Sequence, residues 1–164
     1  MRPLPLVAAA VLALAAIQPA AAQNAAQVDH ARDGASCPRC NLFQADFANL
    51  ELKDRNFAGA RLRQADMSAA VMNHTTMAGA DLRDVNAYGA VFTGVSFAGA
   101  NMTNASFVGT YLQGADFRGA NLSGVNFSGA EMDRAVGLTQ TQLNQACGDA
   151  STTLPRGLRL RSCG

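Results

Sequence analysis

A bulky apolar side chain recurs at every fifth position between residues 42 and 132, without one insertion or deletion. The nineteen positions are Leu42, Phe47, Leu52, Phe57, Leu62, Met67, Met72, Met77, Leu82, Ala87, Phe92, Phe97, Met102, Phe107, Leu112, Phe117, Leu122, Phe127 and Met132, of which only Ala87 is small. A period of five fits neither an amphipathic helix nor an alternating strand. It indicates a solenoid of short stacked units, none of which can bury a core alone.

Each unit has the same internal order, and the unit at 120–124 reads Ala-Asn-Leu-Ser-Gly. The fifth position is Gly in ten of the nineteen units and Asn or Asp in four more, the residue types that tolerate positive φ, so we expect a tight corner there. The second position is often Asn or Asp. Acid–base catalysis would not tolerate the exchange of Asp for Asn, whereas the side chains of both can hydrogen-bond the nearby backbone. This second position, the Asn/Asp slot, is therefore interpreted as structural.

The unit resembles the consensus of the pentapeptide-repeat family, A-(D/N)-L-x-x, and the resemblance extends from Cys40 to Arg134. It implies the fold of that family, an all-β, right-handed quadrilateral parallel β-helix with four pentapeptides per coil. About five coils would stack at ~4.8 Å each, so that residues 20 apart lie above one another. The bulky residue and the small residue two before it would point inward. Arg55 stands at such an inward position in the first coil, where its side chain is expected to reach past the open end.

The two flanks of the repeat predict different roles. Residues 1–22 are interpreted as a secretory signal, with Arg2, an apolar run from Leu6 to Ile17 and a small-residue cleavage site. We therefore expect a periplasmic or secreted protein with no membrane insertion after cleavage. Residues 23–39 would form an N-terminal arm or cap, residues 40–134 the β-helix, and residues 135–164 a C-terminal cap segment.

A short helix is expected within the C-terminal segment. Thr139 and Gln142 can form a capping box, a helix-like run continues through Ala146, and Gly148 would stop it. The segment also resembles the C-terminal extension of exported bacterial pentapeptide-repeat proteins, and the C-P-R-C-N-L stretch at 37–42 resembles their entry motif.

Four cysteines in an exported protein predict disulfides. Of the three pairings that are available, the most economical joins Cys37 to Cys40 and Cys147 to Cys163, although the sequence does not choose among them. One alternative for the C-x-x-C is a redox-active pair, but it lacks the βαβ context that would lower a thiol pKa. The other alternative is a metal site, but zinc requires four ligands and no second Cys/His pair is close in the sequence.

Composition argues against several function classes. Without Arg2, the chain has 12 basic and 12 acidic side chains, and the block from Cys40 to Arg134 has 7 basic and 9 acidic ones. Because a nucleic-acid binder is expected to carry an excess of basic residues, no nucleic-acid partner is expected. The two histidines, His30 and His74, are far apart in the chain, and no nucleophile elbow, phosphate loop or metal-binding cluster is present. The sequence therefore predicts a protein without a catalytic site, a metal or a cofactor. The tail is basic, with Arg156, Arg159 and Arg161.

Stacking residues 20 apart brings both tyrosines of the chain to one corner. The candidate partner patch consists of Val71, Tyr88, Val91, Val108 and Tyr111; the alternative is a ladder of side chains that favour strands. The function expected is an exported structural or protein-interaction scaffold of the cell envelope. A binder of cell-wall polymer or glycan is the main alternative, ahead of a thiol-redox protein or a DNA-mimicking gyrase modulator of the kind found in the family. The sequence identifies no partner and no oligomeric state.

Overall fold

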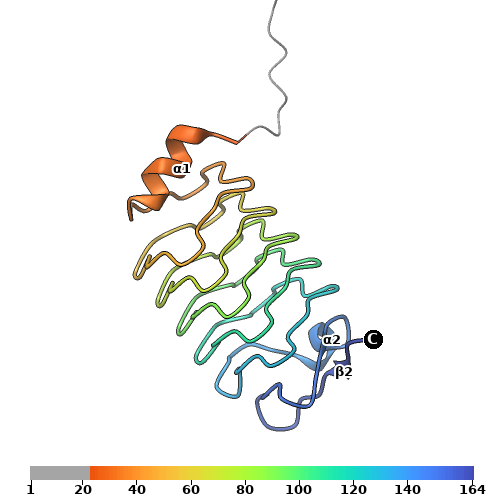
Figure 1. The fold of residues 1–164 in the computed structure, drawn as a ribbon. Helices are drawn as coiled ribbons and strands as arrows, with labels where there is room; N and C mark the ends of the chain where they lie inside the picture. Colours follow the sequence, from red (N-terminus) through yellow and green to blue (C-terminus); the bar gives the residue numbers. More distant parts are fainter. Residues whose placement is uncertain (1–22) are drawn as a thin grey trace, which may run out of the picture.

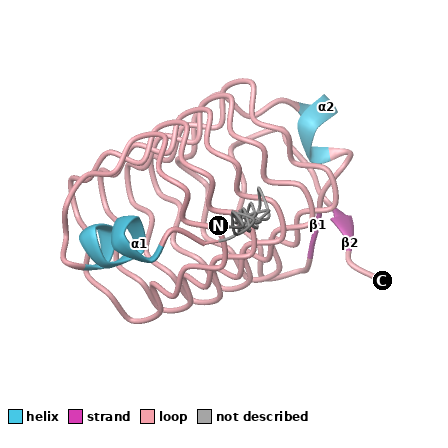
Figure 2. Ribbon diagram, turned by 90° about the horizontal axis from the view of Figure 1, so that it is seen from above, coloured by secondary structure: helices cyan, strands magenta, loops and turns pink. Residues whose placement is uncertain are grey.

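The computed structural model describes residues 23–164, and the predicted secretory signal at 1–22 lies outside the described residues. The chain winds into a rod of stacked coils (Figure 1). Helix α1 (Ala25–Arg32) lies at one end of the stack, and helix α2 (Gln140–Leu143) lies at the other with strands β1 (Cys147–Gly148) and β2 (Arg161–Ser162) (Figure 2). No helix within residues 23–164 is long and apolar enough to cross a membrane.

Parallel backbone pairing between residues 20 apart connects each coil to the next. The bridges run from Asn41↔Arg61 to Asp116↔Val136 with an unchanged register. At each bridge the chain gives and receives a hydrogen bond, as where Leu62 N donates to Asp81 O at 2.8 Å and Asp81 N donates to Ala60 O at 2.9 Å. These evenly spaced bonds are those of a parallel sheet, here cut into single bridges by the corners.

The interior of the rod is filled by the two inward positions of each unit. All nineteen residues of the period-five series are at most 1% exposed, and the small residues before them are buried almost throughout. Aromatic rings stack between coils: Phe97 lies 5.4 Å from Phe117 between ring centroids, and Phe107 lies 5.9 Å from Phe127. At the positions of the small residues, Cys40 and Leu50 are half-buried, and Arg55 is exposed, as expected at the end of the rod.

The corners have the geometry expected from the fifth position of the unit. At the corner 87–90, Ala90 N donates to Ala87 O at 3.1 Å and Gly89 has φ +64°. Non-glycine residues take the same conformation where the unit requires it, including Gln44 at +55° and Ala69 at +54°. In the Asn/Asp slot, Asp46 Oδ1 and Asn56 Oδ1 each accept from the backbone N–H two residues on, both at 2.9 Å. This shared bond explains why Asn and Asp exchange there.

Helix α1 covers the N-terminal end of the rod. Asn24 caps the helix, and Val28 and Ala31 are buried against the first coil. Gln27 Oε1 accepts from Asn41 N at 2.7 Å, and a guanidinium nitrogen of Arg32 donates to the carbonyl of Asp46. Side chains of α1 thus pair backbone groups of the first coil, which has no coil before it.

The C-terminal segment makes the corresponding contacts at the opposite end. The capping box is present, with Gln142 N donating to Thr139 Oγ1 and Thr139 N to Gln142 Oε1. The side-chain nitrogen of Gln142 then donates to Phe117 O at 2.8 Å and to Ala120 O at 2.9 Å. It takes the place of a backbone N–H that a further regular coil would have supplied.

The helix-like run predicted through Ala146 is too long. Helix α2 ends at Leu143, and Gly148 lies in strand β1 and does not end a helix. The reason is competition from the ladder: Cys147 N donates to Val125 O at 2.9 Å, and Phe127 N donates to Cys147 O at 2.8 Å. These bonds require an extended backbone, so the helix must end before them.

Truncation of a stacked ring is expected to be costly. Phe97→Ala removes a fully buried ring with aromatic neighbours at Phe92, Phe107 and Phe117, and should lower the free energy of unfolding by ~3–5 kcal/mol. Urea unfolding followed by circular dichroism measures the loss. The control is Tyr88→Ala, which removes an exposed ring and should change stability by less than ~0.5 kcal/mol. Equal losses in the two variants would contradict the packing described here.

Candidate functional site

The strongest candidate for a functional surface is a corner of the rod that we call the tyrosine corner, formed by Val71, Tyr88, Val91, Val108 and Tyr111. Val71, Val91 and Tyr111 occupy successive bridged positions in one column. Gly89 N donates to Val108 O at 2.9 Å, which places Val108 one coil above Tyr88. Within residues 23–164 the exposed large hydrophobic side chains are Tyr88 at 62%, Tyr111 at 46% and Val136 at 51%.

Polar groups border the tyrosine corner. Glu51 is bridged to Val71 at one end of the column, and Glu131 is bridged to Tyr111 at the other. Beside Tyr88, the Asn86 side chain accepts from Tyr88 N at 3.2 Å and donates to Asp66 Oδ1 at 3.1 Å. An apolar centre with a polar rim is the usual anatomy of a protein interface.

The arginines on another face of the rod are engaged by carboxylates. Arg83 makes two hydrogen bonds to Asp81, at 2.6 and 2.7 Å, and Arg63 Nε lies 3.4 Å from Asp84 Oδ2. The hydrogen bond from Arg83 lowers the pKa of Asp81, against a smaller opposing effect of burial. Because these pairs are partly exposed, each stabilises the fold only slightly.

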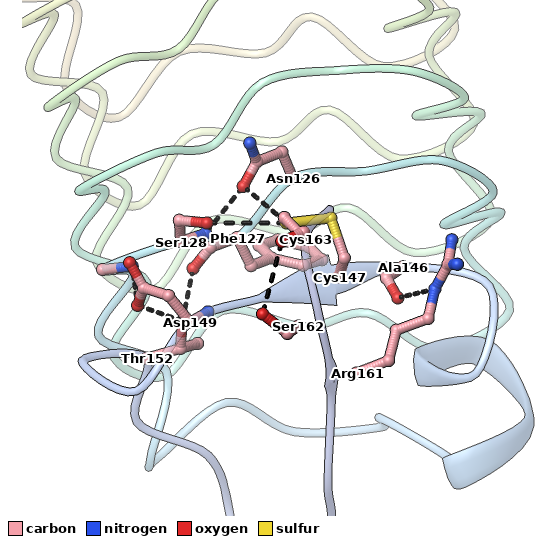
Figure 3. Close-up of a disulfide and its surroundings, with 11 residues drawn as sticks. Asn126, Phe127, Ser128, Ala146, Cys147, Asp149, Thr152, Arg161, Ser162 and Cys163 are labelled. Atoms are coloured by element: carbon pink, nitrogen blue, oxygen red, sulfur yellow. Dashed lines mark hydrogen bonds between the residues drawn. A yellow bond between two sulfur atoms is a disulfide. The ribbon is translucent and has the colours of Figure 1, made fainter.

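All four cysteines form disulfides. Cys37 is joined to Cys40 and Cys147 to Cys163, with Cα–Cα distances of 5.4 and 4.9 Å, which confirms the local pairing. Figure 3 shows the second of these disulfides. His30 lies on α1 and His74 at a corner, where its ring packs over Gly94. Within residues 23–164 no three His, Cys, Asp or Glu side chains are grouped so as to hold a metal ion.

Asp149 organises the turn between the two strands of the C-terminal segment. Its Oδ1 accepts from Ser151 Oγ at 2.6 Å, Gly129 N at 2.9 Å, Ser151 N at 3.0 Å and Thr152 Oγ1 at 3.2 Å. These bonds, led by that from the Ser151 hydroxyl, lower the pKa of Asp149 from 3.8 to about 2. The carboxylate thus connects the C-terminal segment to the last regular coil through Gly129.

The path of the tail was not predicted from the sequence. Strand β2 returns to pair in parallel with β1, Cys147 opposite Arg161, and Cys163 N donates to Gly148 O at 2.9 Å. This return brings Arg159 and Arg161 beside α2, although some fifteen residues or more separate them in sequence. The alternation Leu158-Arg159-Leu160-Arg161 is the signal that could have indicated an extended, one-sided segment.

A stack of five-residue units with short parallel bridges, positive-φ corners and an apolar interior defines a β-helical solenoid. The chain belongs to the pentapeptide repeat family: the model described as Pentapeptide repeats matches eight copies at residues 51–86, 100–136 and 111–147, together just over half of the chain. The fold of this family is a right-handed parallel β-helix.

Several solved structures are similar to this chain. HetL, a pentapeptide repeat protein involved in heterocyst differentiation regulation in the cyanobacterium Nostoc, is 31% identical with a TM-score of 0.60; the match covers 63% of this chain and 49% of HetL. The chain thus spans about half the length of HetL. A pentapeptide repeat protein of the Arabidopsis thaliana thylakoid lumen is 26% identical over 66% of this chain and 61% of its own, with a TM-score of 0.30.

QnrB1, a plasmid-mediated fluoroquinolone resistance protein, is 17% identical over 78% of this chain and 86% of its own, with a TM-score of 0.38. No curated protein matches the chain.

The two disulfides are expected to differ in their contribution to stability. Cys147→Ser with Cys163→Ser opens a loop with a sequence separation of 16 and should cost ~3 kcal/mol, since the constraint on the unfolded chain grows with loop length. Cys37→Ser with Cys40→Ser opens a separation of 3 and should cost ~2 kcal/mol. Urea unfolding of both double variants measures the difference. A larger loss for the shorter loop would contradict this ranking.

The negative charge of Asp149 should stabilise the folded protein at all but strongly acidic pH. Its pKa is lower in the folded protein, about 2 against 3.8, so its contribution is complete above pH 3.8 and is lost as the pH falls through about 2. Asp149→Asn keeps an acceptor oxygen and removes the charge. We expect the variant to unfold at lower urea than the wild type at pH 7, with the gap closing towards pH 2. A gap that stays constant with pH would show that the charge is not involved.

Proposed function

We propose that this protein is an exported, non-enzymatic interaction scaffold of the cell envelope, and that it binds a protein partner through the tyrosine corner. In this proposal residues 1–22 direct export to the periplasm or the outside. A right-handed quadrilateral rod of about five coils presents the corner, and residues 23–39 and 135–164 close its two ends, the latter with a short helical cap.

The observation that carries the proposal is the exposure of both tyrosines beside three half-buried valines on one corner, between polar ends. Tyrosine is enriched in the centres of protein interfaces, because a rigid ring buries a large area at a low cost in side-chain entropy. Elsewhere the outward side chains are mostly Asn, Ser, Thr, Ala, Gly or charged.

Two further observations support binding over catalysis. Pentapeptide repeat proteins are generally structural or interaction proteins without enzymatic activity, and the regulatory role attributed to HetL is consistent with a function exerted through binding. The two disulfides, together with the predicted signal, support an oxidising compartment.

Substitution of both tyrosines by lysine should abolish partner binding and leave the fold intact. Tyr88→Lys with Tyr111→Lys places two charges at the centre of the corner, where a desolvated charge costs far more than a lost contact. The matched control is Ala78→Lys with Ala98→Lys, which changes the position equivalent to Tyr88 on a different corner.

The measurement is cross-linking and affinity capture from the native envelope with all three proteins. The enriched protein is then purified and its Kd determined with each variant. We expect the tyrosine variant to bind at least tenfold more weakly than the wild type, and the alanine control to bind normally. Unchanged affinity of the tyrosine variant, or retention of the wild type on purified wall polymer with no protein captured, would overturn the proposal. The second result would favour a polymer or glycan ligand.

A further inference from the structure

The C-terminal tail lines an open, solvent-accessible cavity of about 650 Å³ where it passes α2. The cavity is lined by Gln140, Asn144, Gly157, Arg159, Leu160 and Arg161. Its volume is within the range of small-molecule sites, and its lining combines one apolar side chain with amide and guanidinium groups. No acidic side chain is part of this lining.

The cavity wall is held by bonds from both sides. The Gln140 amide pairs with the backbone of Arg159, donating to its carbonyl at 3.0 Å and accepting from its N–H at 3.1 Å. Arg161 Nε donates to Ala146 O at 3.2 Å, and the disulfide Cys147–Cys163 anchors the end of the tail (Figure 3). A wall held in this way loses little freedom when a ligand binds.

The two arginines of the wall have no ionic partner within the described chain. Arg159 and Arg161 are exposed, and among residues 23–164 neither forms an ion pair, in contrast to Arg63, Arg83 and Arg118. Two positions apart in an extended segment, they project from the same side, while Leu158 and Leu160 are half-buried against the core. The Nε bond of Arg161 leaves the two terminal nitrogens as the donors of its planar fork.

A smaller cavity of about 330 Å³ lies next to the first and provides a contrast. The two share Leu160 and Arg161, but Asp149 lines the smaller one. Hydrogen bonds, above all from the Ser151 hydroxyl, keep Asp149 ionised, since they lower its pKa to about 2. An anion would therefore meet a carboxylate beside Arg161 in the smaller cavity, whereas the lining of the larger cavity has no carboxylate.

We propose that the larger cavity binds an oxyanion, the phosphate or carboxylate group of a small polar ligand, between the guanidinium groups of Arg159 and Arg161. Guanidinium groups bind both kinds of anion through paired, charge-assisted hydrogen bonds. Asn144 accepts from Gln140 through Oδ1, so its NH₂ group supplies a further donor, and Leu160 supplies an apolar surface for the rest of the ligand. This site is separate from the tyrosine corner.

The test is an amide NMR titration of the purified protein with sodium phosphate, with sodium glucuronate, and with sodium chloride at matched ionic strength. We expect saturable shifts for the side-chain amides of Gln140 and Asn144 and for the backbone of residues 157–161, with phosphate or glucuronate but not with chloride. The anion that binds more tightly identifies a phosphorylated ligand or an acidic sugar as the source of the group.

Two variants assign the effect to the cavity. Arg159→Gln should weaken anion binding at least tenfold. Arg159→Lys keeps the charge without the planar fork, so its affinity for the anion should lie between those of Arg159→Gln and the wild type. Arg156→Gln is the matched control, because Arg156 lies in the same tail but outside the cavity lining. The affinity of this variant for the anion should stay within twofold of that of the wild type. Equal shifts with chloride, no saturation with either anion, or equal losses for Arg156→Gln and Arg159→Gln would overturn the proposal.

Discussion

The backbone pairing of residues 20 apart is the interaction on which the rest of the structure depends. Apart from the bonds within the corners and those to the Asn/Asp side chains, the N–H and C=O groups of a coil point along the rod axis and are paired by the neighbouring coils. A coil with one residue more or fewer would place its inward side chains out of register with those of its neighbours. The unbroken period of five from Leu42 to Met132 is therefore a condition of the fold. It also explains why longer steps occur only in the last turn, where Asn126 pairs with Cys147 and Glu131 with Thr153, since no further coil stacks there.

The same pairing accounts for the form of both ends. A coil without a neighbour would leave its polar backbone open to water or to another rod. At the N-terminal end, α1 supplies Gln27 and Arg32, and at the C-terminal end Gln142 donates to two carbonyls of the preceding coil. These side chains pair backbone groups that a further coil would have paired, so the flanks belong to the hydrogen-bond system of the rod although they do not follow its period.

Much of the fold could be predicted because the repeat makes local and global signals agree. The inward columns, the corners, the Asn/Asp slot and the adjacency of Val71, Val91 and Tyr111 all follow from counting in steps of five and 20. The positive φ of Ala69 shows the limit of residue preference, because the ladder imposes a conformation that alanine does not favour. The length of α2 and the pairing of the returning tail with β1 could not be predicted, since the alternation at 158–161 indicates an extended segment but not its partner, and a disulfide and the ladder determine the position of both strands.

The tyrosine corner lies on the periodic body of the rod, and the larger cavity lies at its irregular C-terminal end. Only two of the five positions in a unit build the core, so the other three can change without loss of packing, as Tyr88 and Tyr111 show by their exposure. The two cavities described above, in contrast, both lie at the C-terminal end, where the period is broken. The chain supplies that break after Val136, where the tail must leave the ladder, form α2 and return through Arg159 and Arg161 to the disulfide. The proposed partner surface on the side of the rod therefore follows from the repeat, and the proposed ligand site at its end follows from the segment that covers the last coil.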